Sequence, residues 1–404
     1  MILPCRIHQV PQRGDSIALA ILLALIFVSP IKAIGQDTAV SPFERTGVSW
    51  LGPIPIQMTA GVNMGYDDNA TLTPSAKGSA FVGEDVVLTY NRPTKATQFY
   101  LLGIGHFDQY FNVSRNDVNG NVTMSLTHNF STRLSFYASV FAAYQTEPNF
   151  TSNVGPENVV SDHFYTNDIF SLTYHWSSRF SMITSFTFNR VKYAQASIGD
   201  SQDRFDNTLS QEFQFSLSRR TNLVGEYRFE RITYDTAPTD STTHFILAGI
   251  NHNLTEHLIV HARAGESFRS LENEGTTANP YFESVVDYVS SNHSLSWISS
   301  FGYESPTAAG VTTTKTWRTG LLLTYVLTSQ LSSTTGVNFH YDENTGGTSS
   351  TGSQNSFDFN LGFRYTINKH FTLNLDYNYT ALSSLASTPG YSRNRCSGGV
   401  TYAF

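Results

Sequence analysis

The sequence predicts an all-β chain that folds as an antiparallel transmembrane β-barrel of about eighteen strands, with sixteen as the next best count. Three observations predict this fold. Apolar and polar residues alternate with a period of two over stretches of about ten residues. A short turn element recurs at intervals of roughly forty residues. Between these turns lie longer polar connections, so that short and long connections alternate along the chain.

The composition excludes several other classes of protein. Charged residues make up 14% of the 404 residues, whereas they make up about 25% of soluble domains. The 28 glycines show no three-residue period and there are only 2 cysteines, which excludes collagen-like chains and disulfide scaffolds. No apolar run after residue 28 is long enough for a membrane-spanning helix. The net charge of −7 argues against a nucleic-acid partner.

The first 35 residues have the organisation of a secretory signal peptide. Basic residues precede the apolar run Ile17–Val28, and small residues follow at Ala33 and Gly35. The run is too short to span a bilayer as a helix, so we expect it to be removed by cleavage after Gly35. The chain is therefore expected to divide into a signal peptide (1–35), a short periplasmic N-terminal segment (36–56) and a transmembrane β-barrel (57–404).

A short element marks the tight turns. It places polar residues between two apolar ones, as in Phe130–Leu134. The pattern recurs at Trp176–Phe180, Leu254–Leu258, Leu327–Leu331 and Ile367–Phe371, and less regularly at Leu217–Leu223 and Val289–Leu295. Because the spacing of these elements suits one pair of strands per interval, they predict successive hairpins.

The segments on either side of each turn alternate as strands do. In 357–367 every odd position from Phe357 to Ile367 is apolar, whereas even positions such as Asp358 and Arg364 are polar or small. Strands that cross a membrane at a tilt need about 9 to 11 residues. These segments therefore have the length and the two-faced pattern of transmembrane β-strands.

The alternation of short turns and long loops gives the orientation. In outer-membrane barrels the long loops are extracellular and the short turns periplasmic. Nine hairpins counted from about Gln57 give eighteen strands, with both ends on the periplasmic side. The strands of a soluble β-sandwich or β-solenoid would also alternate between apolar and polar residues. Their apolar face would consist of Val, Ile and Leu, however, and would not carry aromatic residues at the strand ends.

Aromatic residues near the strand ends predict the two membrane interfaces. Trp176 and Trp297 lie near short turns, Trp317 follows a long loop, and Tyr402 lies near the C-terminus. We assign these four residues to aromatic girdles at the lipid headgroups. The last strand ends on Phe404, and such a terminal aromatic residue resembles the signal that outer-membrane barrels present to their assembly machinery.

The first strand carries a family resemblance. The segment Gly61-Val-Asn-Met-Gly-Tyr-Asp-Asp-Asn-Ala-Thr-Leu-Thr73 combines a Gly-rich strand with an Asp-Asn element. In this it resembles the opening of members of the beta-barrel porin 2 family, whose barrel architecture is similar over about 57–404. The resemblance implies an outer-membrane barrel of Gram-negative-type cells with no assigned chemistry. Some similar barrels accompany exopolysaccharide export, which the resemblance implies as an alternative function.

Strand parity predicts which charged residues line the lumen. If the apolar face contacts lipid, charges of both signs point inward. The residues assigned to the lumen are Glu226, Arg228, Glu230, Arg263, Glu283, Asp287, Arg318, Asp358, Arg364, Asp376 and Arg395. Such residues either hold the wall together as salt bridges or select solutes by charge and size.

One loop is a candidate constriction of the pore. The 147–163 connection is the longest and carries Glu147, Glu157, Asp162 and His163. A barrel of eighteen strands leaves an aqueous channel unless a loop folds inward. The alternative for this segment is a simple surface loop.

We expect a porin-like channel for passive diffusion of small hydrophilic solutes, with an accessory barrel for exopolysaccharide export or a structural barrel as alternatives. No cofactor or metal is expected, because the 12 histidines show no ligand spacing. We expect no enzyme, although abundant Ser, His and Asp leave a membrane-embedded hydrolase open. The Asp67-Asp68-Asn69 element could bind calcium, but a turn is the simpler interpretation.

The expected partners follow from this assignment. They are outer-membrane lipid, the barrel-assembly machinery, and small hydrophilic solutes or polysaccharide, in the bacterial outer membrane. Two segments that are apolar on both faces, Phe99–Ile104 and Phe245–Ile250, are compatible with a homo-oligomer or with packing in the lumen.

Overall fold

The computed structural model describes residues 56–146, 161–237, 239–272, 275–304, 313–345, 352–383 and 389–404. The predicted signal peptide and almost all of the predicted periplasmic segment lie outside the described residues. The first strand begins at Ile56, one residue before the predicted start of the barrel.

Eighteen strands make up most of the described chain, as the alternating pattern predicts. They are β1 (Ile56–Asp67), β2 (Ser79–Asn91), β3 (Thr97–Tyr110), β4 (Asn116–Asn129), β5 (Leu134–Gln145), β6 (His163–His175), β7 (Phe180–Tyr193), β8 (Arg204–Ser218), β9 (Thr221–Tyr234), β10 (Ser241–Asn253), β11 (Leu258–Leu271), β12 (Thr276–Val289), β13 (His293–Glu304), β14 (Thr313–Val326), β15 (Leu331–Thr345), β16 (Gly352–Thr366), β17 (Phe371–Leu382) and β18 (Tyr391–Ala403).

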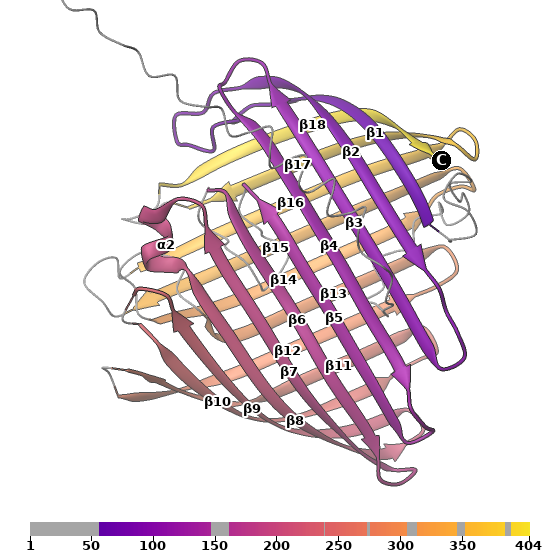
Figure 1. Ribbon diagram of the computed structural model, residues 1–404, viewed down its shortest axis with the longest axis vertical. Helices are drawn as coiled ribbons and strands as arrows, with labels where there is room; N and C mark the ends of the chain where they lie inside the picture. Colours follow the sequence, from indigo (N-terminus) through magenta and orange to yellow (C-terminus); the bar gives the residue numbers. More distant parts are fainter. Residues whose placement is uncertain are drawn as a thin grey trace, which may run out of the picture. The chain divides into compact units, whose positions relative to one another are not determined.

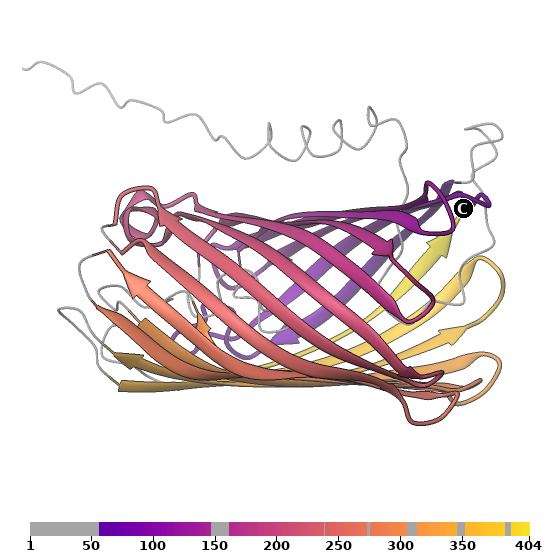
Figure 2. The same cartoon turned by 90° about the horizontal axis from the view of Figure 1, so that it is seen from below.

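The strands form one closed antiparallel sheet. Each strand pairs with the next along the chain, and β1 pairs with β18. The closing pair runs from Thr59 opposite Ala403 to Asp67 opposite Arg395. Figures 1 and 2 show the strands running side by side and obliquely around this sheet. The predicted count of eighteen is confirmed, and closure leaves no sheet edge unpaired.

The two faces of the sheet differ as strand alternation predicts. On β17, Leu373 and Leu375 are 42% and 59% exposed. Thr372, which directly precedes Leu373 and points to the opposite face, is fully buried. Large exposed apolar residues occur in the same alternating way on most strands. A largely apolar outer face over a sheet whose backbone groups pair in the ladder suits contact with a bilayer.

The turn element has a hydrogen-bonding explanation. In the turn between β4 and β5, the Ser131 hydroxyl oxygen accepts hydrogen bonds from the backbone N–H groups of Arg133 and Leu134, at 3.1 Å each. Asn368 plays the same part between β16 and β17, and Ser177, Thr255 and Thr328 do so in three further turns. The polar residue after the first apolar one is therefore the residue that shapes each turn.

Replacing Asn368 with alanine is expected to lower the free energy of unfolding by about 1 kcal/mol, because two backbone donors lose their acceptor. Urea unfolding of the protein in lipid vesicles measures this change. Lys369→Ala is the matched control, since Lys369 is exposed in the same turn. Equal stability of Asn368→Ala and the control would contradict the explanation.

The long connections hold the departures from prediction. A seven-residue helix, α2 (Ala196–Gln202), lies between β7 and β8, where only a loop was expected. Asp203 after it accepts hydrogen bonds from the Tyr193 backbone N–H and the Lys192 ammonium group, at 2.8 Å each. A helix of about two turns is too short for a helical period to show in the sequence. Among the described residues, no helix is long and apolar enough to cross a membrane.

Candidate functional site

Ion pairs show which face of the sheet is the inside. Arg228 on β9 lies 3.2 Å from Glu283 on β12, and Arg263 on β11 lies 2.9 Å from Glu212 on β8. Two strands separate the members of each pair, and neighbouring strands lie about 4.8 Å apart. Side chains can meet over such a distance only where they converge, which is on the concave face of the sheet. The face that carries these pairs is therefore the lumenal face.

The charged residues predicted to line the lumen share this face. Cross-strand register connects them strand by strand, for example Arg263 opposite Glu283 and Arg318 opposite His340. The residues so placed are Glu226, Arg228, Glu230, Arg263, Glu283, Asp287, Arg318, Asp358, Arg364, Asp376 and Arg395. Their role in selecting solutes remains a prediction.

A central network joins Glu212, Glu226, Arg228, Arg263 and Glu283 across β8 to β12. Arg228 donates through Nε to Glu226 at 2.9 Å and through both terminal nitrogens to Glu283. Arg263 donates to Glu212 at 2.9 Å and lies 4.0 Å from Glu226. Each arginine thus meets two carboxylates, and the network neutralises charges that would be costly to leave alone in a partly buried wall.

Aromatic rings in the lumen stack against these arginines. The Arg228 guanidinium lies 5.6 Å from the ring centres of both Phe245 and Tyr281. Tyr281 also donates its hydroxyl proton to Glu283 at 2.5 Å. In the same way the Arg395 guanidinium lies 4.2 Å above the ring of Phe81. The rings therefore support the wall by cation–π contact rather than lying bare to the lumen.

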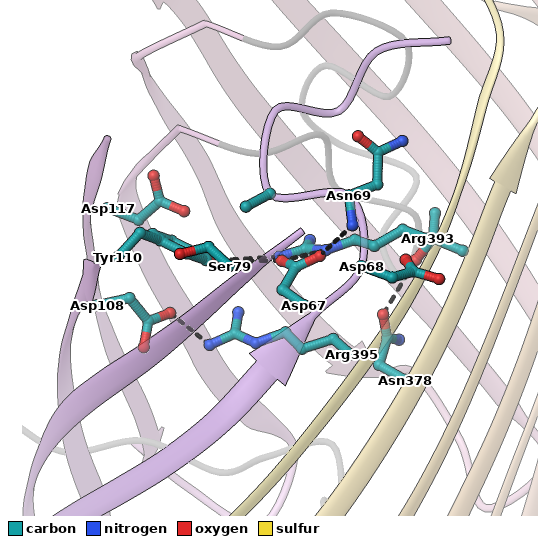
Figure 3. Close-up of polar contacts among 12 residues, drawn as sticks. Asp67, Asp68, Asn69, Ser79, Asp108, Tyr110, Asp117, Asn378, Arg393 and Arg395 are labelled. Carbon is teal, nitrogen blue, oxygen red and sulfur yellow. Dashed lines mark hydrogen bonds and ion pairs between the residues drawn. The ribbon is translucent and has the colours of Figure 1, made fainter. Parts of the chain in front are cut away.

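A second network, the seam network, consists of Asp67, Asp108, Tyr110, Arg393 and Arg395 and lies where the first and last strands meet (Figure 3). Arg393 donates to Asp67 Oδ2 through Nε at 2.8 Å and through Nη2 at 2.5 Å. Tyr110 donates its hydroxyl proton to the same carboxylate at 3.3 Å. Arg395 pairs with Asp108 on β3, two strands beyond its neighbour β1.

The seam network continues into a histidine held between two carboxylates. His106 Nδ1 lies 2.5 Å from Asp85 Oδ1, and Nε2 lies 2.8 Å from Asp108 Oδ2. Neither this group nor Arg393 is among the residues predicted from the sequence to line the lumen. Arg393 has the same strand parity as Arg395, and that signal would have placed it in the lumen.

The Asp67-Asp68-Asn69 element makes contacts that explain all three of its side chains. Asp67 binds Arg393, and Asp68 accepts hydrogen bonds from the backbone and side-chain N–H groups of Asn394, at 2.7 Å each. The Asn69 amide donates to the carbonyl oxygens of Thr73 and Ser392. The element thus ties β1 and its loop to β18. The described residues contain no group of three side chains suited to a metal ion.

The predicted constriction loop is described only at its end. Glu147 and Glu157 lie outside the described residues. Asp162 accepts a hydrogen bond from the Thr146 hydroxyl at 2.7 Å. His163 is fully buried at the start of β6, where its ring is stacked with that of Tyr165 and Nδ1 lies 2.7 Å from the Ser161 carbonyl oxygen. Both residues therefore fix the base of the loop.

The four aromatic residues assigned to girdles lie on the convex side or in a turn. Trp176, in the turn after β6, and Trp317, in the half of β14 near the long loop, are 57% and 46% exposed. Trp297 donates its indole N–H to Thr319 at 2.9 Å. Tyr402 contacts the ring of Phe404, whose backbone N–H donates to the Met58 carbonyl oxygen. Their contact with lipid and the assembly role of Phe404 remain predictions.

Comparison with known proteins matches the C-terminal part of the chain to a family model. Residues 275–404 match the family model of the outer membrane protein beta-barrel domain. A search of the curated proteins found no match. OpdK of Pseudomonas aeruginosa is similar at a TM-score of 0.42 and 10% identity, over 86% of this chain and 99% of that chain. OccAB4 of Acinetobacter baumannii is similar at 0.40 and 9%, over 90% and 100% respectively.

The closed barrel, its apolar outer face and the family match define an outer-membrane β-barrel protein. This chain is accordingly a protein of the bacterial outer membrane. The predicted fold class and location are confirmed, and the family match describes the barrel without assigning it a solute.

Proposed function

We propose that the protein is a porin-like channel through which small hydrophilic solutes diffuse passively. The observation that carries the proposal is a wall of eighteen strands in which most of the lumenal arginines pair with carboxylates along the wall itself. Barrels of sixteen to eighteen strands are wider than their own side chains fill. The ion pairs join residues on the same strand or on nearby strands, so they run along the wall. They can therefore stabilise the wall while the centre of the lumen stays open.

The lumenal aromatic residues favour diffusion over polysaccharide export. An export channel for a sugar polymer would offer bare aromatic faces along its path. Here Phe81 is 1% exposed beneath Arg395, and Phe245 is 4% exposed beside Arg228. We therefore rank export, and a structural barrel without transport, below passive diffusion. The proposal is for transport without catalysis.

Swelling of proteoliposomes tests the proposal. Vesicles containing the mature protein are placed in isotonic solutions of uncharged sugars from a pentose to a trisaccharide. We expect swelling rates that fall steeply with sugar size, because a water-filled path sieves by diameter. Rates that are nearly equal for all sugars would favour the export alternative. No swelling with protein shown to be inserted and rich in β-structure would overturn the proposal.

A further inference from the structure

The arginines of the lumenal face are engaged in ion pairs with the wall. Within the described strands this face carries eight arginines, and six of them pair with carboxylates of the same face. The six are Arg204, Arg228, Arg263, Arg318, Arg393 and Arg395. None of these side chains is more than 20% exposed. The positive charge of the lumen is therefore largely neutralised and withdrawn from water.

Carboxylates outnumber the arginines on the same face. The described strands place fourteen carboxylates there against the eight arginines. Four of them, the uncompensated carboxylates, have no arginine, lysine or histidine within 4.0 Å in the described chain: Glu230, Asp287, Asp358 and Asp376. Asp67 and Asp108 are fully buried in their ion pairs, but Asp85 at 40% and Glu283 at 32% are more exposed than any of the six paired arginines.

The loops add little positive charge to the lumen. In the described long loops Lys77 is exposed, and Arg115 pairs with Asp117 at 2.6 Å. The stretches 147–160, 273–274, 305–312, 346–351 and 384–388 contain three glutamates and neither lysine nor arginine. Basic residues do occur in the short turns, for example Arg133 and Lys369, but they lie beyond the strand ends and are exposed. Electrolyte screens such charges over about 8 to 10 Å. They therefore act weakly on ions inside the barrel.

We infer that the channel is selective for cations, and that the uncompensated carboxylates, Asp287 and Asp376 above all, set this selectivity. The inference rests on the proposed function, because it requires an open path. Side chains of one sign inside a low-dielectric wall raise the local concentration of ions of the opposite sign. Asp287 and Asp376 are half-buried rather than buried, so their charges act on the water of the lumen.

The zero-current potential across a planar bilayer under a KCl gradient tests the inference. The variants are Asp287→Asn with Asp376→Asn, which removes two lumenal charges, and Arg364→Gln, which removes a cation that forms no ion pair among the described residues. Glu343→Gln is the matched control, because Glu343 lies on the convex face of β15. It changes the net charge of the protein without changing that of the lumen.

We expect a K⁺ over Cl⁻ permeability ratio clearly above one in the unaltered protein. The double aspartate variant should lower the ratio by about two-fold or more, Arg364→Gln should raise it, and Glu343→Gln should leave it unchanged. A conducting channel with a ratio of one or below, or one that Glu343→Gln and the double variant change equally, would overturn the inference alone. An inserted protein that conducts nothing would overturn the proposed function and the inference with it.

Discussion

Replacing Asp67 with asparagine is expected to lower the free energy of unfolding by about 3 to 5 kcal/mol. Asp67 is fully buried, and Arg393 on the opposite side of the closing seam is 4% exposed. The substitution removes the negative charge that offsets a buried guanidinium and weakens the hydrogen bonds that it accepts from Arg393 and Tyr110. Because Asp67 and Arg393 join β1 to β18, the substitution should weaken the strand pair that closes the barrel.

Urea unfolding in lipid vesicles, followed by the mobility of the folded protein in unheated gels, measures the effect. Asp68→Asn is the matched control, because an asparagine at position 68 keeps an acceptor for the Asn394 backbone N–H. This substitution should change the free energy of unfolding by less than about 1 kcal/mol. A double-mutant cycle with Arg393→Gln should show a coupling of about 2 to 3 kcal/mol. Additive effects of Asp67→Asn and Arg393→Gln would contradict the assignment of the pair to the seam.

Arg228→Gln is expected to have the second largest effect, a loss of about 3 kcal/mol. Arg228 is the shared partner of Glu226 and Glu283, and the Glu226 side chain is 6% exposed. Without the guanidinium, both carboxylates and the Tyr281 hydroxyl lose a charged donor in a wall with little water. The central network would then hold three carboxylates against the single guanidinium of Arg263.

Arg364→Gln is the comparison that separates this loss from a general effect of lumenal charge. It removes the same charge from the same face, but Arg364 is exposed and forms no ion pair among the described residues. Its stability should change by less than about 0.5 kcal/mol. If the two glutamine variants unfold at the same urea concentration, the central network does not stabilise the wall.

The fold could be read from the sequence because a barrel strand repeats one simple pattern. Period-two alternation assigns each side chain to a face, and the turn residues such as Ser131 and Asn368 fix where each strand begins. A shift of register by one residue would turn every lumenal charge toward lipid. Alternation and turns therefore sufficed to place residues such as Arg263 and Asp376 on one face.

The partners of these residues could not be read in the same way. Asp67 and Arg393 are 326 positions apart in the chain and meet only because the sheet closes with a particular stagger. The start of β12 at Thr276 cannot be read from the sequence either, because the alternating pattern is weak there. Pairing between strands along the lumenal wall depends on closure and strand tilt, which local sequence patterns do not contain.

The single-channel conductance of the refolded mature protein tests the central claim most directly. A water-filled path through the barrel predicts discrete ohmic steps, whose conductance rises with the concentration of salt on both sides. The Asp67→Asn variant, once inserted, should show the same conductance steps. Its folded state should be lost sooner than that of the unaltered protein when urea is added. Silence from protein shown to be inserted and rich in β-structure would contradict the account of the barrel as an open channel.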